Sequence, residues 1–251
     1  RIDDWEEQRS KRSARLERGG QGLSILKSLE DLRPKTVPLL ATYLEKEILE
    51  VQPIADQERK AAERAAAQVK LQSELDKLDE IRAQAYPFIQ RNDFVGAADL
   101  LQKASTDFQV EEARQLLQAT REGFLSLQKM KLFLSQSFRS NPFRQGAREL
   151  GGTVISGSAE TLVIQLASGV GQTERTWAQV QPQTLVQMAE QYISAAQMNP
   201  REKADLWTAA SFFLYVHGGF PRAAAFAQQA VAANPEQAPQ IRRLMPGMLS
   251  E

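Results

Sequence analysis

The sequence predicts a mainly α-helical protein, built of helical hairpins with a small three-stranded antiparallel β-meander inserted, which is an α+β arrangement. Apolar residues recur at steps of three and four over most of the chain, the period of an amphipathic helix. Between residues 151 and 180 this period is replaced by short runs rich in β-branched residues and separated by glycines. After Pro182 the helical spacing returns and continues to the end of the sequence.

Residues 1–22 are predicted to form a polar lead-in or linker. Charges of both signs dominate there, and the pair Gly19–Gly20 favours the end of any helix that forms. The following residues, 23–145, are predicted to form an N-terminal helical region. It begins with two short helices, since Pro34 and Pro38 interrupt the apolar pattern.

The longest helix of this region is predicted over residues 54–90. Alanines dominate residues 61–67, and apolar residues then continue at helical steps from Leu71 to Phe88. Leucines with charged flanks also fit a coiled coil, although the seam extends over only about two to three heptads. Packing within one molecule is therefore the main interpretation, and a homodimer through this helix is the alternative.

Shorter elements follow the long helix. Helices are predicted over residues 94–104 and 110–137. The β-meander of residues 151–180 has three predicted strands, at residues 153–156, 161–166 and 173–177. Such a sheet is too small to be stable alone, so one face is expected to pack on the helices. Residues 183–251 are predicted to form a C-terminal helical region that contains a hairpin.

An internal similarity links two of these helices. Residues 94–104 align with residues 220–230 and match Phe94 to Phe220, Ala97–Ala98 to Ala223–Ala224, Gln102 to Gln228 and Ala104 to Ala230. The pattern resembles the second helix of a tetratricopeptide-like (TPR-like) hairpin. The resemblance implies that the small residues let two helices approach closely and that the aromatic fills the gap at the turn. Because the two copies are not in tandem, two locally similar hairpins in a non-repeat fold are the alternative.

The order of elements carries a second resemblance. A polar lead-in, a helical hairpin, a strand module that ends in Thr176–Trp177, the helix start QPQTL at residues 181–185 and a terminal hairpin follow one another. This order is similar to the C-terminal regions of some bacterial membrane-anchored serine/threonine kinases. No kinase motif is present, so the resemblance implies a non-catalytic sensor or interaction segment.

Composition argues against several classes of function. The 31 basic and 31 acidic residues cancel, so the chain has no bulk positive field for nucleic acid. With no cysteine and one histidine, a zinc, iron or copper site is not expected, and no cofactor is predicted. No apolar run approaches the roughly 20 residues of a spanning helix, so these residues are not expected to insert into a membrane.

No catalytic residue is predicted, and the chain is expected not to be an enzyme. The glycine-containing loop of residues 168–175 lacks the lysine and the following helix of a phosphate-binding loop. His217 precedes Gly218–Gly219 at a helix end, where it is expected to cap the last carbonyl groups. Paired carboxylates lie on charged helix faces, where solvated ion pairs are the norm.

Two residues at the end of the third strand are predicted to bind a partner. Arg175 and Trp177 are of the types that binding hot spots favour, and a strand edge can accept a peptide. For Trp177 the favoured interpretation is nevertheless that it packs the sheet on the helices.

The expected function is therefore a non-enzymatic protein–protein interaction or scaffold segment of a larger bacterial protein. It would recognise a protein or peptide on the concave side of its hairpins. The alternative is an extracytoplasmic domain of a membrane-anchored signalling protein that senses a small ligand. The absence of cysteine favours an extracytoplasmic, periplasmic location.

Overall fold

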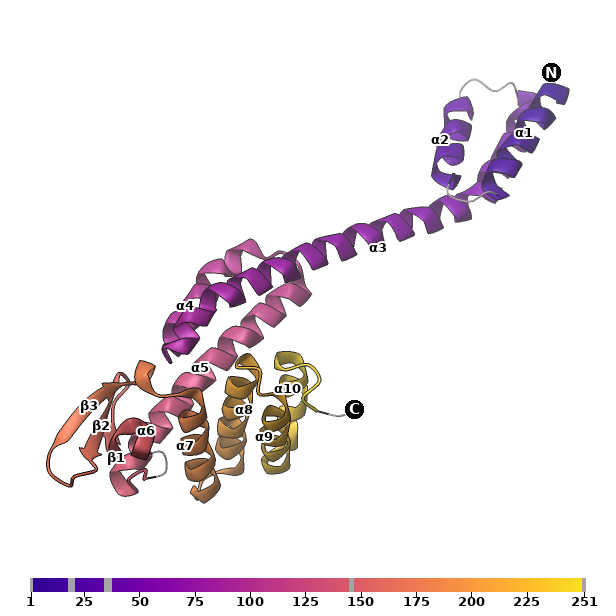
Figure 1. The fold of residues 1–251 in the computed structure, drawn as a ribbon. Helices are drawn as coiled ribbons and strands as arrows, with labels where there is room; N and C mark the ends of the chain where they lie inside the picture. The colour runs from indigo at the N-terminus through magenta and orange to yellow at the C-terminus, as the bar shows by residue number, and fades with distance from the viewer. Residues whose placement is uncertain (1, 18–20, 34–37, 145–146, 250–251) are drawn as a thin grey trace. The chain divides into compact units, whose positions relative to one another are not determined.

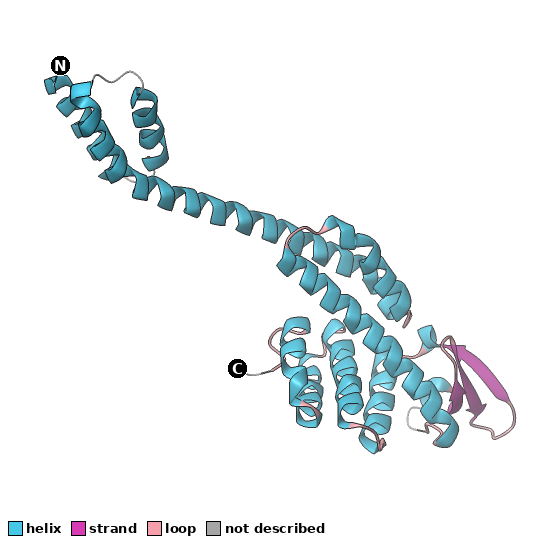
Figure 2. Ribbon diagram, turned by 180° about the vertical axis from the view of Figure 1, so that it is seen from behind, coloured by secondary structure: helices cyan, strands magenta, loops and turns pink. Residues whose placement is uncertain are grey.

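The computed structural model describes residues 2–17, 21–33, 38–144 and 147–249 (Figure 1). The predicted breaks at Gly19–Gly20 and Pro34 lie outside these residues. The predicted fold class is confirmed, because helices dominate and one three-stranded antiparallel sheet is present among the described residues (Figure 2). The chain forms two compact units, residues 1–73 and 74–251, and helix α3 (Pro38–Gln90) contributes to both. This division differs from the predicted one, which kept 23–145 together and set 1–22 apart.

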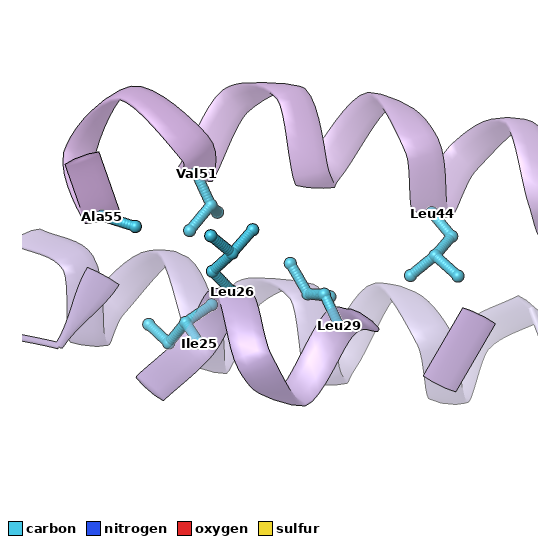
Figure 3. Packing of buried hydrophobic residues seen from close by; sticks show 6 residues of the cluster. All are labelled: Ile25, Leu26, Leu29, Leu44, Val51 and Ala55. Atoms are coloured by element: carbon cyan, nitrogen blue, oxygen red, sulfur yellow. The ribbon is translucent and has the colours of Figure 1, made fainter. Parts of the chain in front are cut away.

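The first unit contains α1 (Ile2–Glu17), α2 (Gly22–Leu32) and the first part of α3. Its apolar core lies between α2 and α3 and consists of Ile25, Leu26, Leu29, Leu44, Val51 and Ala55 (Figure 3). Helix α1 is tied to α3 by Arg12, whose guanidinium donates to both carboxylate oxygens of Glu47 at 2.5 and 2.7 Å. The charged N-terminal segment is thus a helix docked within the first unit.

Helix α3 begins earlier than predicted. The expected start was residue 54, after a separate short helix, but α3 runs without interruption from Pro38 to Gln90. Pro53 lies inside it on an exposed position, although an interior proline removes one hydrogen bond and costs about 3 kcal/mol. Burial of Val51 and Ala55 on the opposite side favours continuation of the helix. Local sequence alone does not include this tertiary contribution.

The middle of α3 has no buried side. Residues 59–70 are exposed on every face, and alanine, the best helix former, keeps this stretch helical. Packing within one molecule, as predicted, applies to the end of α3, where Leu78, Ile81, Ala85 and Ile89 are buried. The homodimer through this helix stays a prediction.

Carboxylates begin the next two helices of the second unit, α4 (Phe94–Ala104) and α5 (Glu111–Ser140). The Asp93 carboxylate accepts from the Gly96 N–H at 2.9 Å and caps α4. The buried carboxylate of Glu74, on α3, accepts from the N–H groups of Gln109 and Val110 just before α5. Both contacts satisfy main-chain donors that a helix start leaves unpaired.

The sheet is the predicted meander. Strands β1 (Gly152–Gly157), β2 (Thr161–Leu166) and β3 (Gln172–Thr176) pair antiparallel in the order β1-β2-β3, with an irregularity between Val154 and Ser156. Val154, Leu162 and Ile164 are buried on one face. That face packs on α5 and on the short helix α6 (Ala147–Leu150), as expected for a sheet too small to be stable alone.

The C-terminal helices complete the second unit (Figure 1). They are α7 (Pro182–Ala195), α8 (Pro200–Val216), α9 (Phe220–Ala233) and α10 (Ala238–Leu244). Helix α8 packs on α5, and an aromatic contact of 6.2 Å between Phe94 and Phe213 joins the two predicted hairpins. Trp207 is buried against Phe226, as expected for a core residue.

The two aligned copies differ in their aromatic residues. Phe94 is fully buried, as the resemblance to a TPR-like hairpin implies. Phe220 was expected to fill the equivalent gap, and this is wrong: its side chain is 51% exposed and contacts only Tyr215 among the aromatic rings described. The buried aromatic of α9 is Phe226, six residues further along the helix. The matched alanines Ala97 and Ala223 are buried in both copies.

Candidate interaction groove

Trp177 lies in the core, not on the surface. It begins the short 3-10 helix η3 (Trp177–Gln179), is 1% exposed and packs beside Phe138 of α5. Its indole N–H donates to the Ser158 carbonyl at 3.0 Å. A buried indole offers no surface to a partner. The position of Trp177 agrees with the interpretation that it packs the sheet on the helices. The prediction that Trp177 forms a contact surface is corrected accordingly.

A buried polar cluster surrounds this tryptophan. The Asn92 side chain donates to the Trp177 carbonyl at 2.7 Å, and Lys131 Nζ donates to the Asn92 carbonyl at 3.0 Å while lying 5.4 Å from the indole centre. Burial lowers the pKa of Lys131, and the nearby Asp93 and Glu160 carboxylates oppose this shift. The cluster joins the α3–α4 turn, α5 and the end of the sheet. Its groups bond to one another, so its role is structural.

Arg175 lines a polar hollow between the sheet and the helices. The hollow has a volume of about 750 Å³ and is lined by residues of α6, β3, η3 and α7, namely Glu149, Leu150, Arg175, Gln179, Gln181, Pro182 and Gln183. Among the described residues the Arg175 guanidinium makes no ion pair, whereas the Glu149 carboxylate accepts from the Thr184 hydroxyl. Arg175 and Trp177, predicted as one site, therefore face different surroundings.

A longer groove follows one side of α5. Its deeper part has a volume of about 560 Å³ and lies between α5, the start of α8 and α10. Its apolar lining consists of Leu125, Phe133, Met198 and Leu206, which we call the floor, and Glu122, Glu202, Asp205 and Lys129 carry its charges. We call this part the apolar hollow.

A second hollow extends this groove along α5. Its volume is about 440 Å³, and it shares Glu122 with the apolar hollow. The α5 residues that line the two hollows gather on one side of the helix, at positions 111, 114, 115, 118, 119, 122, 125, 126, 129 and 133. One continuous face of α5 therefore forms the wall, and at 1.5 Å per residue it is about 33 Å long. We call the whole feature the α5 groove.

Sequence reasoning missed this groove. The helical period predicts that Leu125 and Phe133 lie on one buried side of α5, and both are partly buried. The groove exists because α8 and α10 cover that side incompletely. Only the tertiary packing decides how far a neighbouring helix reaches.

His217 lies at the C-terminus of α8, as predicted. Its Nδ1 is 2.8 Å from the Phe213 carbonyl oxygen, and its ring stacks on that of Phe213 at 4.2 Å. Burial lowers the pKa of the imidazole, and the hydrogen bond to the carbonyl partly opposes this shift. Both contacts agree with a capping role.

The part of the chain that the structure describes has neither a metal-binding cluster nor a membrane-spanning helix. Within it, no group of three or more His, Cys, Asp or Glu side chains could hold a metal ion. None of the described helices is both long and apolar enough to cross a bilayer. A comparison with known proteins finds no match among protein-family models, curated proteins or solved structures.

Proposed function

We propose that this chain is a non-enzymatic interaction segment of a larger bacterial protein, and that it binds a partner protein in the α5 groove. The observation that carries the proposal is the apolar hollow. It leaves Leu125, Phe133 and Met198 only partly buried at the bottom of a concave surface. A partner side chain placed there would remove apolar surface from water at about 25 cal/mol per Å².

The scaffold around the groove supports a binding role. Helices α5 and α8 are held together by buried aromatic contacts, including one of 5.4 Å between Phe124 and Phe212. A Cβ atom added at Gly123 would lie 2.7 Å from the Phe212 ring, so the two helices approach closely there. The walls of the groove are thus fixed before a partner arrives, and a preorganised surface loses less entropy on binding.

Site-specific crosslinking tests the proposal. A photoreactive amino acid at Ser126, which lines the groove, is expected to capture a partner in source cells, whereas the same amino acid at the exposed Glu236 is not. The captured protein is then purified and titrated against the unmodified chain. Ser126→Trp, which fills the apolar hollow, should weaken binding at least tenfold. Unchanged affinity of Ser126→Trp, with its fold intact, would show that the groove is not the binding surface.

A second candidate function is small-ligand sensing, as in an extracytoplasmic signalling domain. The observation in its favour is the hollow at Arg175. There a cation without an ion-pair partner among the described residues shares the lining with three glutamines and with Glu149, whose carboxylate accepts from Thr184. A thermal-shift screen of acidic metabolites and cell-wall fragments tests it, because a ligand that binds the native state raises the melting temperature. The rise should be saturable and should disappear in Arg175→Gln. A rise that persists in this variant would place the ligand elsewhere.

A further inference from the structure

We propose that the partner enters the α5 groove as an amphipathic helix whose apolar stripe is flanked by lysine and arginine. This inference rests on the proposed function and specifies the chemistry of the partner.

The charges of the apolar hollow favour a cationic partner. Glu122, Glu202 and Asp205 face one ammonium group, that of Lys129, which leaves a formal charge of −2. The second hollow adds Arg243 and the ion pair of Glu111 with Arg114, so the negative charge of the α5 groove is concentrated in the apolar hollow. Glu122 accepts from the Gln118 amide, and Asp205 accepts from the Gln237 amide at 2.5 Å. None of the three carboxylates makes an ion pair with a described residue. Cations of a bound partner placed over the apolar hollow would therefore complement its charge and speed association.

The walls of the groove favour a helix over an extended peptide. They are formed mainly by α5, α8 and α10, whose main-chain N–H and C=O groups already bond within each helix. An extended peptide binds by pairing its main chain with a free strand edge, and these walls have none. A helix satisfies its own main-chain groups and needs only side-chain contacts from the groove.

The length and the floor of the groove suit such a helix. The face of α5 that lines it is about 33 Å long, which is the length of a helix of roughly 22 residues. The floor residues Leu125 and Phe133 are eight positions apart, about two turns of α5. Apolar partner residues at steps of three, four and seven would lie over this floor. Leu132, seven positions after Leu125, is a further exposed apolar residue of α5.

A display library of helical peptides tests the inference. The library keeps a leucine stripe at positions i, i+4, i+7 and i+11 and randomises the flanking positions. Selection against the full chain is expected to enrich lysine and arginine at the flanks. Enrichment of acidic residues, no charge preference, or no recovered binder would overturn the inference.

Charge-reversal variants then test whether the selected peptides bind in the α5 groove. Glu202→Arg should weaken binding of a purified basic peptide at least tenfold in fluorescence anisotropy, and Glu236→Arg, an exposed control on the same unit, should not. Equal loss in both variants would mean attraction to net charge alone and would contradict the inference. Scrambling the leucine stripe at constant charge should abolish binding, and retention of affinity would also overturn it.

The basic-helix inference and the proposed function can fail independently of each other. A cellular partner that crosslinks at Ser126 through a neutral or acidic segment, and that loses affinity for Ser126→Trp, would leave the proposed function in place and refute only the basic helix. If Glu202→Arg lost binding of the basic peptide while Ser126→Trp did not affect the cellular partner, the basic helix would stand and the proposed function would be refuted. Sedimentation of the chain alone shows whether a second copy occupies the groove, and a concentration-dependent dimer abolished by Ser126→Trp would replace the basic helix as occupant.

Discussion

The side-chain amide of Asn92 donates a 2.7 Å hydrogen bond to the main-chain carbonyl of Trp177, which lies 85 residues later in the chain. Asn92 is buried and adopts a left-handed backbone conformation with φ of 53°. Lys131 binds the Asn92 carbonyl from α5. One turn residue thus connects the first hairpin of the second unit, α5 and the end of the sheet.

Substitution of Asn92 separates its two contributions. Asn92→Ala removes the buried hydrogen bond. It also places alanine at a positive φ, which alanine tolerates less well than asparagine, so a loss of about 2–3 kcal/mol of unfolding free energy is expected. Asn92→Gly removes only the hydrogen bond, because glycine adopts positive φ readily, and should cost about 1 kcal/mol less. Chemical denaturation measures both. Equal losses would mean that the backbone conformation contributes nothing to the difference.

The two aligned phenylalanines should differ in their effect on stability. Phe94→Ala leaves a cavity in the core beside Phe213 and is expected to cost about 3–5 kcal/mol. Phe220→Ala removes a half-exposed ring and should cost less than about 1 kcal/mol. Thermal unfolding of the two variants compares them directly. A loss at Phe220 as large as that at Phe94 would restore the role at the turn that the resemblance implies.

The ion pair of the first unit should contribute more than its exposed neighbour. The side chains of Arg12 and Glu47 are 12% and 6% exposed, so Glu47→Ala removes two largely buried, charge-assisted hydrogen bonds between α1 and α3. We expect the free energy of local opening of α1 and α2 to fall by about 2–3 kcal/mol. Glu50→Ala breaks the exposed pair with Arg9 and should cost about 0.5 kcal/mol or less. Amide hydrogen exchange resolved along α1 and α2 distinguishes the two results.

The histidine titration has a defined sign. Burial lowers the pKa of His217 below its ordinary value of 6.5, so the folded protein binds the proton more weakly than the unfolded chain does. This contribution to stability is fully present above pH 6.5 and is lost as the pH falls through the lowered pKa of the folded state. Because the chain has one histidine, its imidazole NMR signals need no assignment among others.

Two measurements check this titration. The NMR midpoint should lie below 6.5, and His217→Gln should flatten the dependence of unfolding free energy on pH just below 6.5. A midpoint at or above 6.5 would show that the hydrogen bond to Phe213, rather than burial, sets the pKa.

Much of the local structure could be predicted from the sequence. The strands at Thr161–Leu166 and Gln172–Thr176 were placed within one residue, because alternation and glycine turns act over a few neighbouring positions. The start of α3 could not be predicted, since Pro53 signals a helix end and only the packing of Val51 and Ala55 offsets it. The candidate site was predicted least well. Trp177 was singled out for partner binding, and its burial agrees with the favoured packing interpretation instead, whereas the α5 groove was not expected at all.

The sequence by itself determined the fold class and the faces of the elements, because the helical and strand periods place each apolar residue on a defined side. Only the tertiary structure decided which of those sides a neighbour covers. It buried Phe94 and exposed Phe220, although both begin helices of similar sequence. It also left the α5 groove open, because α8 and α10 cover only part of the apolar side of α5. Coverage depends on contacts between residues far apart in the chain, and no local period contains that information.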